Sequence, residues 1–404
     1  MSAGTITTSR ATARTPGAGF VASIDNAFSY WRLRLEADLA GVDRERHNLY
    51  RVIQFGLAHP TTVTGAVHLA LALYPLVLAR GYWREWAPLL RQALDHCCSQ
   101  DLRLRVSLLD FLGQAQRVSG EVEAAIASHE AAAALAETLD EPFALSEAYH
   151  FLARAHLDAR HYALAEQYAQ AVLNLPPIET PLGRHYVADS LRTLALSARS
   201  RGNFELAIRT MGLAVDIWRQ DGDRYRLATG LHDLGLTVRL AGDPDLALVF
   251  LVQAAELLDG TVYVTDQIIV QYNIGVVYFT REEWPQAERA FRQIDIGYLR
   301  ETGNLVWEVN VLTALGNTLL YQARYEEAIC LLGSAVAIRR QLEDPVERAN
   351  AIGALGEALA GQGEREQALA CFDEAIALLA AFPDHPRSRR LTAFFDEKRA
   401  ELDP

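Results

Sequence analysis

The strongest constraint on the fold of this chain is a pattern of small and apolar residues that recurs about every 40 residues. One position in each copy, called the anchor, is alanine in seven of the eight copies. The interval between successive anchors never departs from that period by more than two positions. A chain with such a period is expected to be a stack of similar units, each contacting mainly its neighbours. The eight anchors are Trp86, Ala125, Ala165, Ala207, Ala247, Ala287, Ala328 and Ala368.

The residues around each anchor predict two closely packed helices. A leucine or isoleucine stands thirteen residues before every anchor, and seven of the eight residues twelve before it are glycine or alanine. In the copy around Ala328 these residues are Leu315 and Gly316, and Tyr325 stands three before the anchor. Small residues at a crossing allow two backbones to approach, while larger side chains fill the space beside it. Each copy is therefore predicted to be a helix, a short turn and a second helix.

These positions resemble those of tetratricopeptide repeats between Thr62 and Leu379, although the family has a shorter usual period. The longer period is similar to that of kinesin light chains and of the helical sensor arms of bacterial signal-transduction (STAND-type) ATPases. Trp83 and the segment HNLYRVIQFGLAHP at residues 47–60 look most like the second group, whose nucleotide-binding module is not found in this sequence. The resemblance implies an all-α fold, a right-handed α-solenoid of about eight helix-turn-helix repeats.

The sequence divides into four predicted regions. Residues 1–20 lack an apolar stretch, so a disordered tail is expected rather than a secretory signal, with an organellar transit peptide as the alternative. Residues 21–61 are expected to form an N-terminal helical cap or a degenerate repeat, with helices over 21–39 and 43–58 and Gly41 in the turn. Residues 62–380 form the predicted solenoid. In residues 381–404 a capping helix is expected over 391–402, with Phe394 and Phe395 covering the end of the core.

Composition excludes several classes of function. Lys398 is the only lysine, so 37 of the 38 basic residues are arginine. A Walker-type phosphate loop and Schiff-base chemistry both need lysine, which excludes them outside the C-terminal end. The net charge of −13 argues against nucleic acid as the main partner. Because Cys97, Cys98, Cys330 and Cys371 lack zinc-site spacing, they are expected to be reduced core residues of a cytoplasmic protein without metal or cofactor.

The most apolar stretch, residues 63–79, approaches the length of a membrane span. His68 and Pro75 interrupt it, and Leu73 falls on the repeat pattern. A buried helix is therefore expected, and no membrane partner.

Candidate binding residues lie on one face of each first helix, at the positions fifteen, eleven and eight before the anchor. In tetratricopeptide proteins the corresponding stripe lines the concave surface. Five of its 21 positions are arginine, where the composition predicts about two, and the planar guanidinium suits carboxylate recognition. The alternative is that these arginines are solvated or pair with acids of the next repeat. The polar candidates are Arg117, Arg154, Arg192, Arg199, His232 and Arg239.

The next repeats add apolar and amide side chains. Tyr272 and Phe279 lie on the stripe and are expected to accept an apolar side chain, unless a neighbouring helix covers them. Asparagine offers both a donor and an acceptor to a peptide backbone. In peptide-binding tetratricopeptide proteins, inner asparagines act as such a clamp, and the resemblance extends this role to Asn317 and, more weakly, to Asn273 and Asn310.

Together these features predict a noncatalytic adaptor whose concave groove holds a peptide or protein segment with acidic and apolar side chains. The alternative is a sensor arm that binds a small molecule or a signalling peptide and regulates a partner protein. A purely structural oligomerisation scaffold is the third possibility. No arrangement of residues typical of a catalytic site is found in the sequence.

Overall fold

The computed structural model describes residues 18–98, 100–177, 179–342 and 344–402. All regular secondary structure in these ranges is helical, which confirms the prediction of an all-α solenoid of helix-turn-helix repeats. The chain divides into two compact units, unit 1 (Met1–Ser197) and unit 2 (Ala198–Pro404). Of the predicted tail, residues 1–17 lie outside the described residues, whereas residues 18–20 belong to the first helix.

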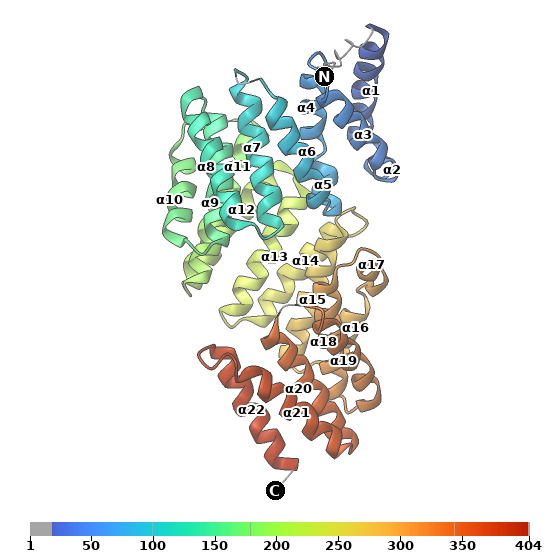
Figure 1. Cartoon of the computed structure of the whole chain (residues 1–404). Helices are drawn as coiled ribbons and strands as arrows, with labels where there is room; N and C mark the ends of the chain where they lie inside the picture. The colour runs from blue at the N-terminus through green and yellow to red at the C-terminus, as the bar shows by residue number, and fades with distance from the viewer. Residues whose placement is uncertain (1–17, 99, 178, 343, 403–404) are drawn as a thin grey trace, which may run out of the picture. The chain divides into compact units, whose positions relative to one another are not determined.

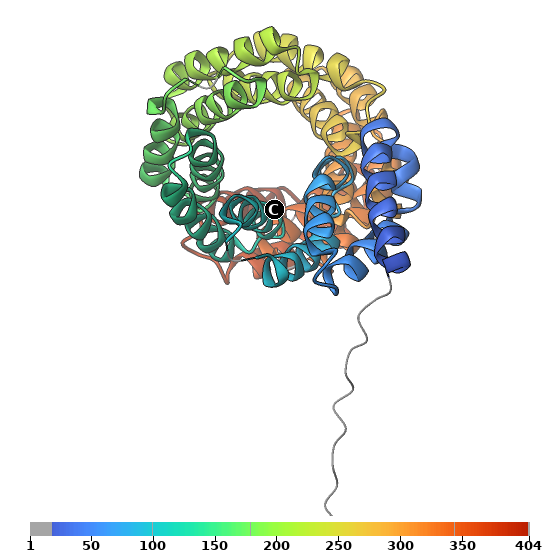
Figure 2. The same ribbon diagram turned by 90° about the horizontal axis from the view of Figure 1, so that it is seen from above.

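Every anchor lies in the second helix of its repeat, and the helices follow one another in chain order (Figure 1). Within each unit the first and second helices form two layers (Figure 2). The first helices are α4 (Val63–Ala72) with α5 (Tyr74–Arg80), α7 (Leu102–Val118), α9 (Pro142–Asp158), α11 (Pro181–Ser200), α13 (Arg224–Leu240), α15 (Val264–Thr280), α18 (Leu305–Tyr321) and α20 (Pro345–Gln362). The second helices are α6 (Trp83–His96), α8 (Val122–Leu139), α10 (Tyr162–Asn174), α12 (Phe204–Asp221), α14 (Pro244–Leu258), α16 (Trp284–Arg292), α19 (Tyr325–Arg339) and α21 (Arg365–Leu379), and a short helix, α17 (Ile296–Glu301), follows α16.

The small residues of the repeat pattern lie where the two helices of a pair cross. Ala328 in α19 is 0% exposed. A Cβ atom added at Gly316 in α18 would lie 2.7 Å from Cγ of Leu332, a distance that real Cβ atoms do not tolerate. The leucine therefore fills the space that the glycine leaves, and the predicted packing role of Gly316 and Ala328 is confirmed.

The short turn of each repeat has a left-handed residue five positions before the anchor. Glycine occupies five of the eight turns, for example Gly120 with φ of 85° and Gly363 with φ of 93°. The other turns place Arg160, Glu282 and Ala323 at φ of 60°, 60° and 57°. Side chains with a Cβ are strained there by about 1 kcal/mol, so the helix packing maintains the turn even without glycine.

The N-terminal region differs from the prediction. Three helices, α1 (Ala18–Ala37), α2 (Leu39–Arg44) and α3 (Arg46–Leu57), replace the two expected ones, and Gly41 lies inside α2 rather than in a turn. The cause is a helix cap: the Asp38 carboxylate accepts a hydrogen bond from the Gly41 N–H at 2.8 Å, which starts α2 at Leu39.

The C-terminal helix is longer than predicted. α22 (Pro386–Leu402) begins at Pro386 because proline fits the first turn of a helix, where its missing N–H is not needed. Phe395 is 1% exposed and its ring centre lies 6.0 Å from that of Phe372, so it covers the last helix pair as expected. Phe394 is 36% exposed and contributes less to that cover.

The apolar stretch Val63–Arg80 is, among the described residues, the one long and apolar enough to cross a membrane by length and composition. It is divided into α4 and α5, and 44% of it is buried in the protein. Leu69, Leu73 and Leu76 are fully buried in the core of unit 1.

Two cysteines are not core residues, contrary to the prediction. Cys98 and Cys330 are exposed, whereas Cys97 is buried and Cys371 is half-buried. Cys330 lies two residues after the anchor Ala328, which turns its side chain about 200° away from the buried face of α19. Cys98 follows the end of α6.

Candidate functional site

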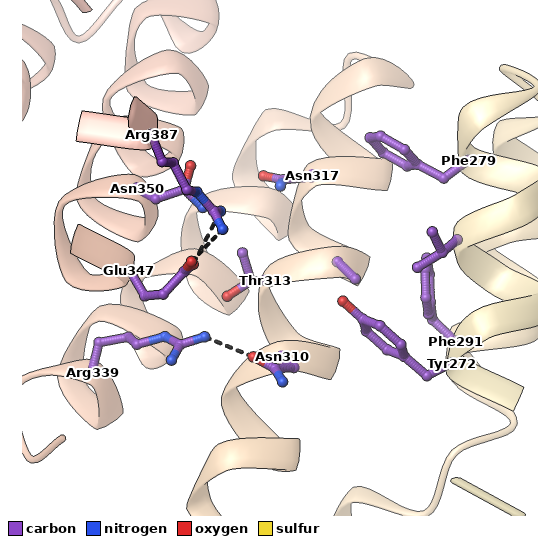
Figure 3. A pocket seen from close by; sticks show the side chains of 12 residues that line it. Tyr272, Phe279, Phe291, Asn310, Thr313, Asn317, Arg339, Glu347, Asn350 and Arg387 are labelled. Carbon is purple, nitrogen blue, oxygen red and sulfur yellow. Dashed lines mark hydrogen bonds and ion pairs between the residues drawn. The ribbon is translucent and has the colours of Figure 1, made fainter. Parts of the chain in front are cut away.

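A cavity of about 210 Å³ lies on the predicted stripe of unit 2. Aromatic side chains form one wall and polar side chains the opposite wall (Figure 3). The lining residues are Tyr272, Val276, Phe279, Phe291, Asn310, Thr313, Ala314, Asn317, Arg339, Glu347, Asn350 and Arg387.

The aromatic wall is held in place by ring contacts. The Tyr272 ring centre lies 5.6 Å from that of Phe291 and 5.4 Å from that of Trp307, and the Phe279 ring centre lies 5.0 Å from that of Trp284. Burial raises the pKa of the Tyr272 hydroxyl, so this group is protonated at neutral pH. The wall is therefore preorganised to accept an apolar side chain beside one hydroxyl donor.

The polar wall presents a row of amides. Asn310, Thr313 and Asn317 follow one another along one face of α18, and Asn350 comes from α20 (Figure 3). The Thr313 hydroxyl donates to the backbone oxygen of Val309 at 2.7 Å. The Asn317 Oδ1 atom is buried and accepts no hydrogen bond from the described part of the protein. Because buried amide oxygens normally have a donor, Asn317 is ready to accept one from a ligand.

Arg339 occupies a repeat position at which most other repeats have a buried apolar residue. It stands eleven residues after its anchor and is 8% exposed. A guanidinium at such a position carries a desolvation cost that leucine or alanine does not. The buried apolar equivalents are Cys97, Ala136, Trp218, Leu258 and Leu379.

Arg339 also lacks a counter-ion within the described part of the chain. Its Nη2 donates to Oδ1 of Asn310 at 2.7 Å, and its Nε has no hydrogen-bond partner. No carboxylate oxygen of a described residue lies within 4.0 Å of its nitrogens. An incoming carboxylate would supply both the missing charge and the missing hydrogen bond.

The remaining charges make the cavity positive. Arg387 pairs with Glu347, with Nη2 and Oε2 3.2 Å apart. The lining thus has two guanidinium groups and one carboxylate. Burial is the largest cause of the raised pKa of Tyr272, while the positive charges of Arg339, Arg239 and Arg387 act to lower it. All three arginines therefore contribute to the electrostatic potential at this hydroxyl.

Four of the residues predicted from the sequence line this cavity: Tyr272, Phe279, Asn310 and Asn317. Arg239 lies outside the lining but close enough to act on Tyr272, and its Nε has no hydrogen-bond partner among the described residues. Burial lowers the pKa of Arg239, and the neighbouring Arg199 lowers it further. These two arginines extend the positive surface beyond the cavity.

His232 and Asn273 bind each other instead of lining the cavity. The Asn273 amide donates to Nε2 of His232 at 3.0 Å and to the backbone oxygen of Ile269 at 2.8 Å. The other ring nitrogen of His232, Nδ1, lies 3.6 Å from Oδ1 of Asp233. Both donors of Asn273 therefore have partners within the protein.

The predicted arginines of unit 1 lie among acidic residues. Arg117 forms an ion pair with Asp158 and donates from Nε to Gln114 at 3.0 Å. Arg154 Nε lies 3.9 Å from the same aspartate. For Arg117 this is the alternative that the sequence left open, an arginine paired with an acid of the next repeat. Arg192 is half-buried in α11.

Ion pairs and hydrogen bonds, both between and within repeats, occupy the corresponding face of unit 1. Arg103 Nη1 lies 2.9 Å from Oε2 of Glu147, and the Tyr186 hydroxyl donates to Oε1 of that glutamate at 3.0 Å. Asp110 and His129 are both 0% exposed, with Oδ1 and Nδ1 3.0 Å apart. Burial raises the pKa of Asp110 and lowers the pKa of His129 to about 3. Burial thus favours the uncharged form of both groups.

Sequence reasoning missed Arg339, Glu347 and Arg387. The predicted stripe began fifteen positions before the anchor, but the same helix face extends further, with Asn350 and Glu347 eighteen and twenty-one positions before Ala368. Arg339 lies in a second helix, which the stripe did not include. The signal that could have found it is a basic residue where most other repeats have an apolar one.

Models of the tetratricopeptide repeat match residues 186–259, 266–341 and 348–387. These segments are tetratricopeptide repeats. They include Tyr272, Asn310 and Arg339 of the cavity. No curated protein matches the sequence significantly.

Solved structures show the same solenoid fold. A STAND protein with a tetratricopeptide repeat sensor from Pyrococcus horikoshii matches 87% of this chain with a TM-score of 0.63 and 15% identity, and this chain spans 55% of its length. A Rap protein complexed with competence and sporulation factor matches 83% of this chain and 97% of its own, with a TM-score of 0.53 and 12% identity. The quorum sensor NprR from B. thuringiensis matches 74% of this chain and 80% of its own, with a TM-score of 0.55 and 14% identity.

Proposed function

We propose that this protein is a noncatalytic binding module that holds a peptide or protein segment in the cavity of unit 2. The observation that carries the proposal is Arg339, a buried guanidinium without a counter-ion among the described residues, at a position that is apolar in most other repeats. Such a residue lowers stability, and a binding role accounts for its presence. The proposal includes a cytoplasmic location and no nucleic-acid, membrane or cofactor partner.

The cavity suggests how a segment would bind. A carboxylate would lie on Arg339 through two parallel hydrogen bonds. An apolar side chain would contact Tyr272 and Phe279, and the Asn317 amide would accept a backbone N–H. Recognition would therefore require an acidic group next to an apolar one.

The test uses a random hexapeptide phage library selected on the full chain and on the variant Arg339→Leu. Leucine is the residue of the equivalent positions 258 and 379, so the variant is expected to fold with unchanged or higher thermal stability. We expect the wild-type protein to enrich peptides with an acidic and an apolar residue, and Arg339→Leu to bind them at least tenfold more weakly.

Arg340→Leu is the matched control because Arg340 follows in sequence but is largely exposed, with a side-chain exposure of 59%. It removes the same charge and should leave binding within about twofold. Equal binding by the wild-type protein and Arg339→Leu would contradict the proposal.

A sensor function is the second candidate. Two proteins of similar fold favour it, since one is complexed with competence and sporulation factor and the other is a quorum sensor. In this case the selected peptide alone would change the shape of the protein. Small-angle scattering with and without the peptide distinguishes the two, because an adaptor should give superimposable profiles and a sensor should not.

A further inference from the structure

Unit 2 has a second cavity, of about 360 Å³, that the proposed function does not use. It lies where α22 meets α20, the end of α18 and the start of α19. Its lining combines the rings of Tyr321 and Tyr325 with the carboxylates of Glu357 and Glu401 and the ammonium group of Lys398.

The two cavities follow each other along the same helices. Asn350 of the first cavity and Glu357 of the second are seven residues apart on α20, which is two helical turns or about 10 Å. Phe279 of the first cavity and Tyr321 of the second have ring centres 5.5 Å apart. One extended segment can therefore reach both cavities.

Glu357 is the unpaired charge of the second cavity. Lys398 Nζ binds Oε2 of Glu401 at 2.9 Å, whereas Glu357 has no hydrogen-bond or ion-pair partner among the described residues. Burial raises the pKa of Glu357 to about 7; Lys398 acts to lower it and Glu401 to raise it. The ionised carboxylate is poorly solvated, so a cation beside it would be stabilised.

The aromatic rings suit the same cation. Tyr321 is 57% exposed and stacks on Trp284, with ring centres 4.8 Å apart and an interplanar angle of 9°. Tyr325 is fixed against Gly361, where an added Cβ would lie 2.3 Å from its ring. Guanidinium and ammonium groups bind over such rings, and a carboxylate at the same place completes a site for them.

We propose that the second cavity binds a basic side chain, arginine or lysine, of the same peptide whose carboxylate lies on Arg339. This inference rests on the proposed function. Asn310, which binds Arg339, and Tyr321 of the second cavity lie eleven residues apart on α18, or about 16 Å, which corresponds to about five residues of an extended peptide. The ligand is therefore a segment with an acidic group and a basic residue four or five positions apart.

The phage selection tests this inference through the sequences that it enriches. The full chain should enrich peptides with a basic residue four or five positions from the acidic one. Peptides with the basic residue should bind roughly tenfold more weakly to Glu357→Gln than to the wild-type protein, whereas versions with glutamine at that position should bind both proteins equally. The preference for the acidic residue should persist in Glu357→Gln. Glu366→Gln is the matched control because Glu366 is exposed in the first turn of α21.

The pH supplies a second readout that needs no variant. Binding of the basic peptide should strengthen, relative to its glutamine version, as the pH rises from 5.5 to 8 and Glu357 ionises. Lys398 and Glu401 are the charged groups that face Glu357.

The outcomes separate the two proposals. Enrichment of acidic and apolar peptides without a basic preference, or a basic preference that Glu357→Gln leaves intact, overturns only the second cavity's assignment. If the wild-type protein enriches no peptide, the proposed function fails and this inference fails with it.

Discussion

Polar residues at similar repeat positions bind one another in unit 1 but line a cavity in unit 2. In unit 1, Arg103, Glu147 and Tyr186 stand twenty-two, eighteen and twenty-one positions before their anchors and bind one another across repeats. In unit 2, Asn310 and Glu347 stand eighteen and twenty-one positions before theirs, and they line a cavity. Asn310 and Glu347 also have partners, Arg339 and Arg387, but a cavity remains beside them. A polar residue on the stripe thus indicates a binding site only where such a space remains.

The largest effect is expected from breaking the buried pair of unit 1. His129→Ala leaves the Asp110 carboxyl buried without its imidazole partner and opens a space beside Gly113, which now contacts that ring. We expect a loss of about 4 kcal/mol in the free energy of unfolding, measured by urea denaturation.

His47→Ala is the control because His47 is exposed. At temperatures where His129→Ala remains folded, peptide selection should match that of the wild-type protein, since the pair lies outside the unit 2 cavity. A loss below about 1 kcal/mol in the free energy of unfolding would show that the pair of Asp110 and His129 does not stabilise unit 1.

Glu357→Gln should have a smaller effect of the opposite sign. The pKa of Glu357 is about 7 in the folded protein and 4.5 ordinarily, so the folded state binds more protons between these values. The wild-type protein therefore loses stability as the pH rises from 4.5 to 7. Allowing for partial exposure, we expect Glu357→Gln to be more stable by about 2 kcal/mol at pH 8 and nearly unchanged at pH 4. Thermal unfolding at both pH values measures this, and a pH-independent difference would refute it.

The smallest effect on stability is expected from the left-handed turn residue that the repeats of both units share. Replacing Arg160 in unit 1 or Ala323 in unit 2 with glycine removes a strained left-handed side chain from the same turn. Each change should stabilise the protein by about 0.5 kcal/mol, because relief of strain slightly exceeds the entropy cost of glycine. Thermal denaturation should give equal shifts for both. Unequal shifts would mean that the framework differs between the units as well as the side chains on it.

The framework was predictable from the sequence because it depends on local spacing. Ala328 and Gly316 had to be small at a helix crossing, and the regular repeat period placed every other crossing. The site was predictable only in part. Tyr272, Phe279 and Asn317 followed from the stripe, but the role of Arg339 depends on its lacking a counter-ion among the described residues, which is a property of three-dimensional packing. Arg117 shows the opposite case. The sequence predicted it as a binding residue, but in the structure it pairs with Asp158 of the next repeat.

Lys398 allows the second cavity to be labelled chemically. It is the only lysine among 404 residues, and its side chain is 33% exposed at the cavity rim. An amine-reactive dye or cross-linker would therefore modify this side chain, together with any free α-amino group, and none of the 37 arginines. A fluorophore attached there, paired with a labelled peptide, would report energy transfer from a side chain of known position without any engineered cysteine.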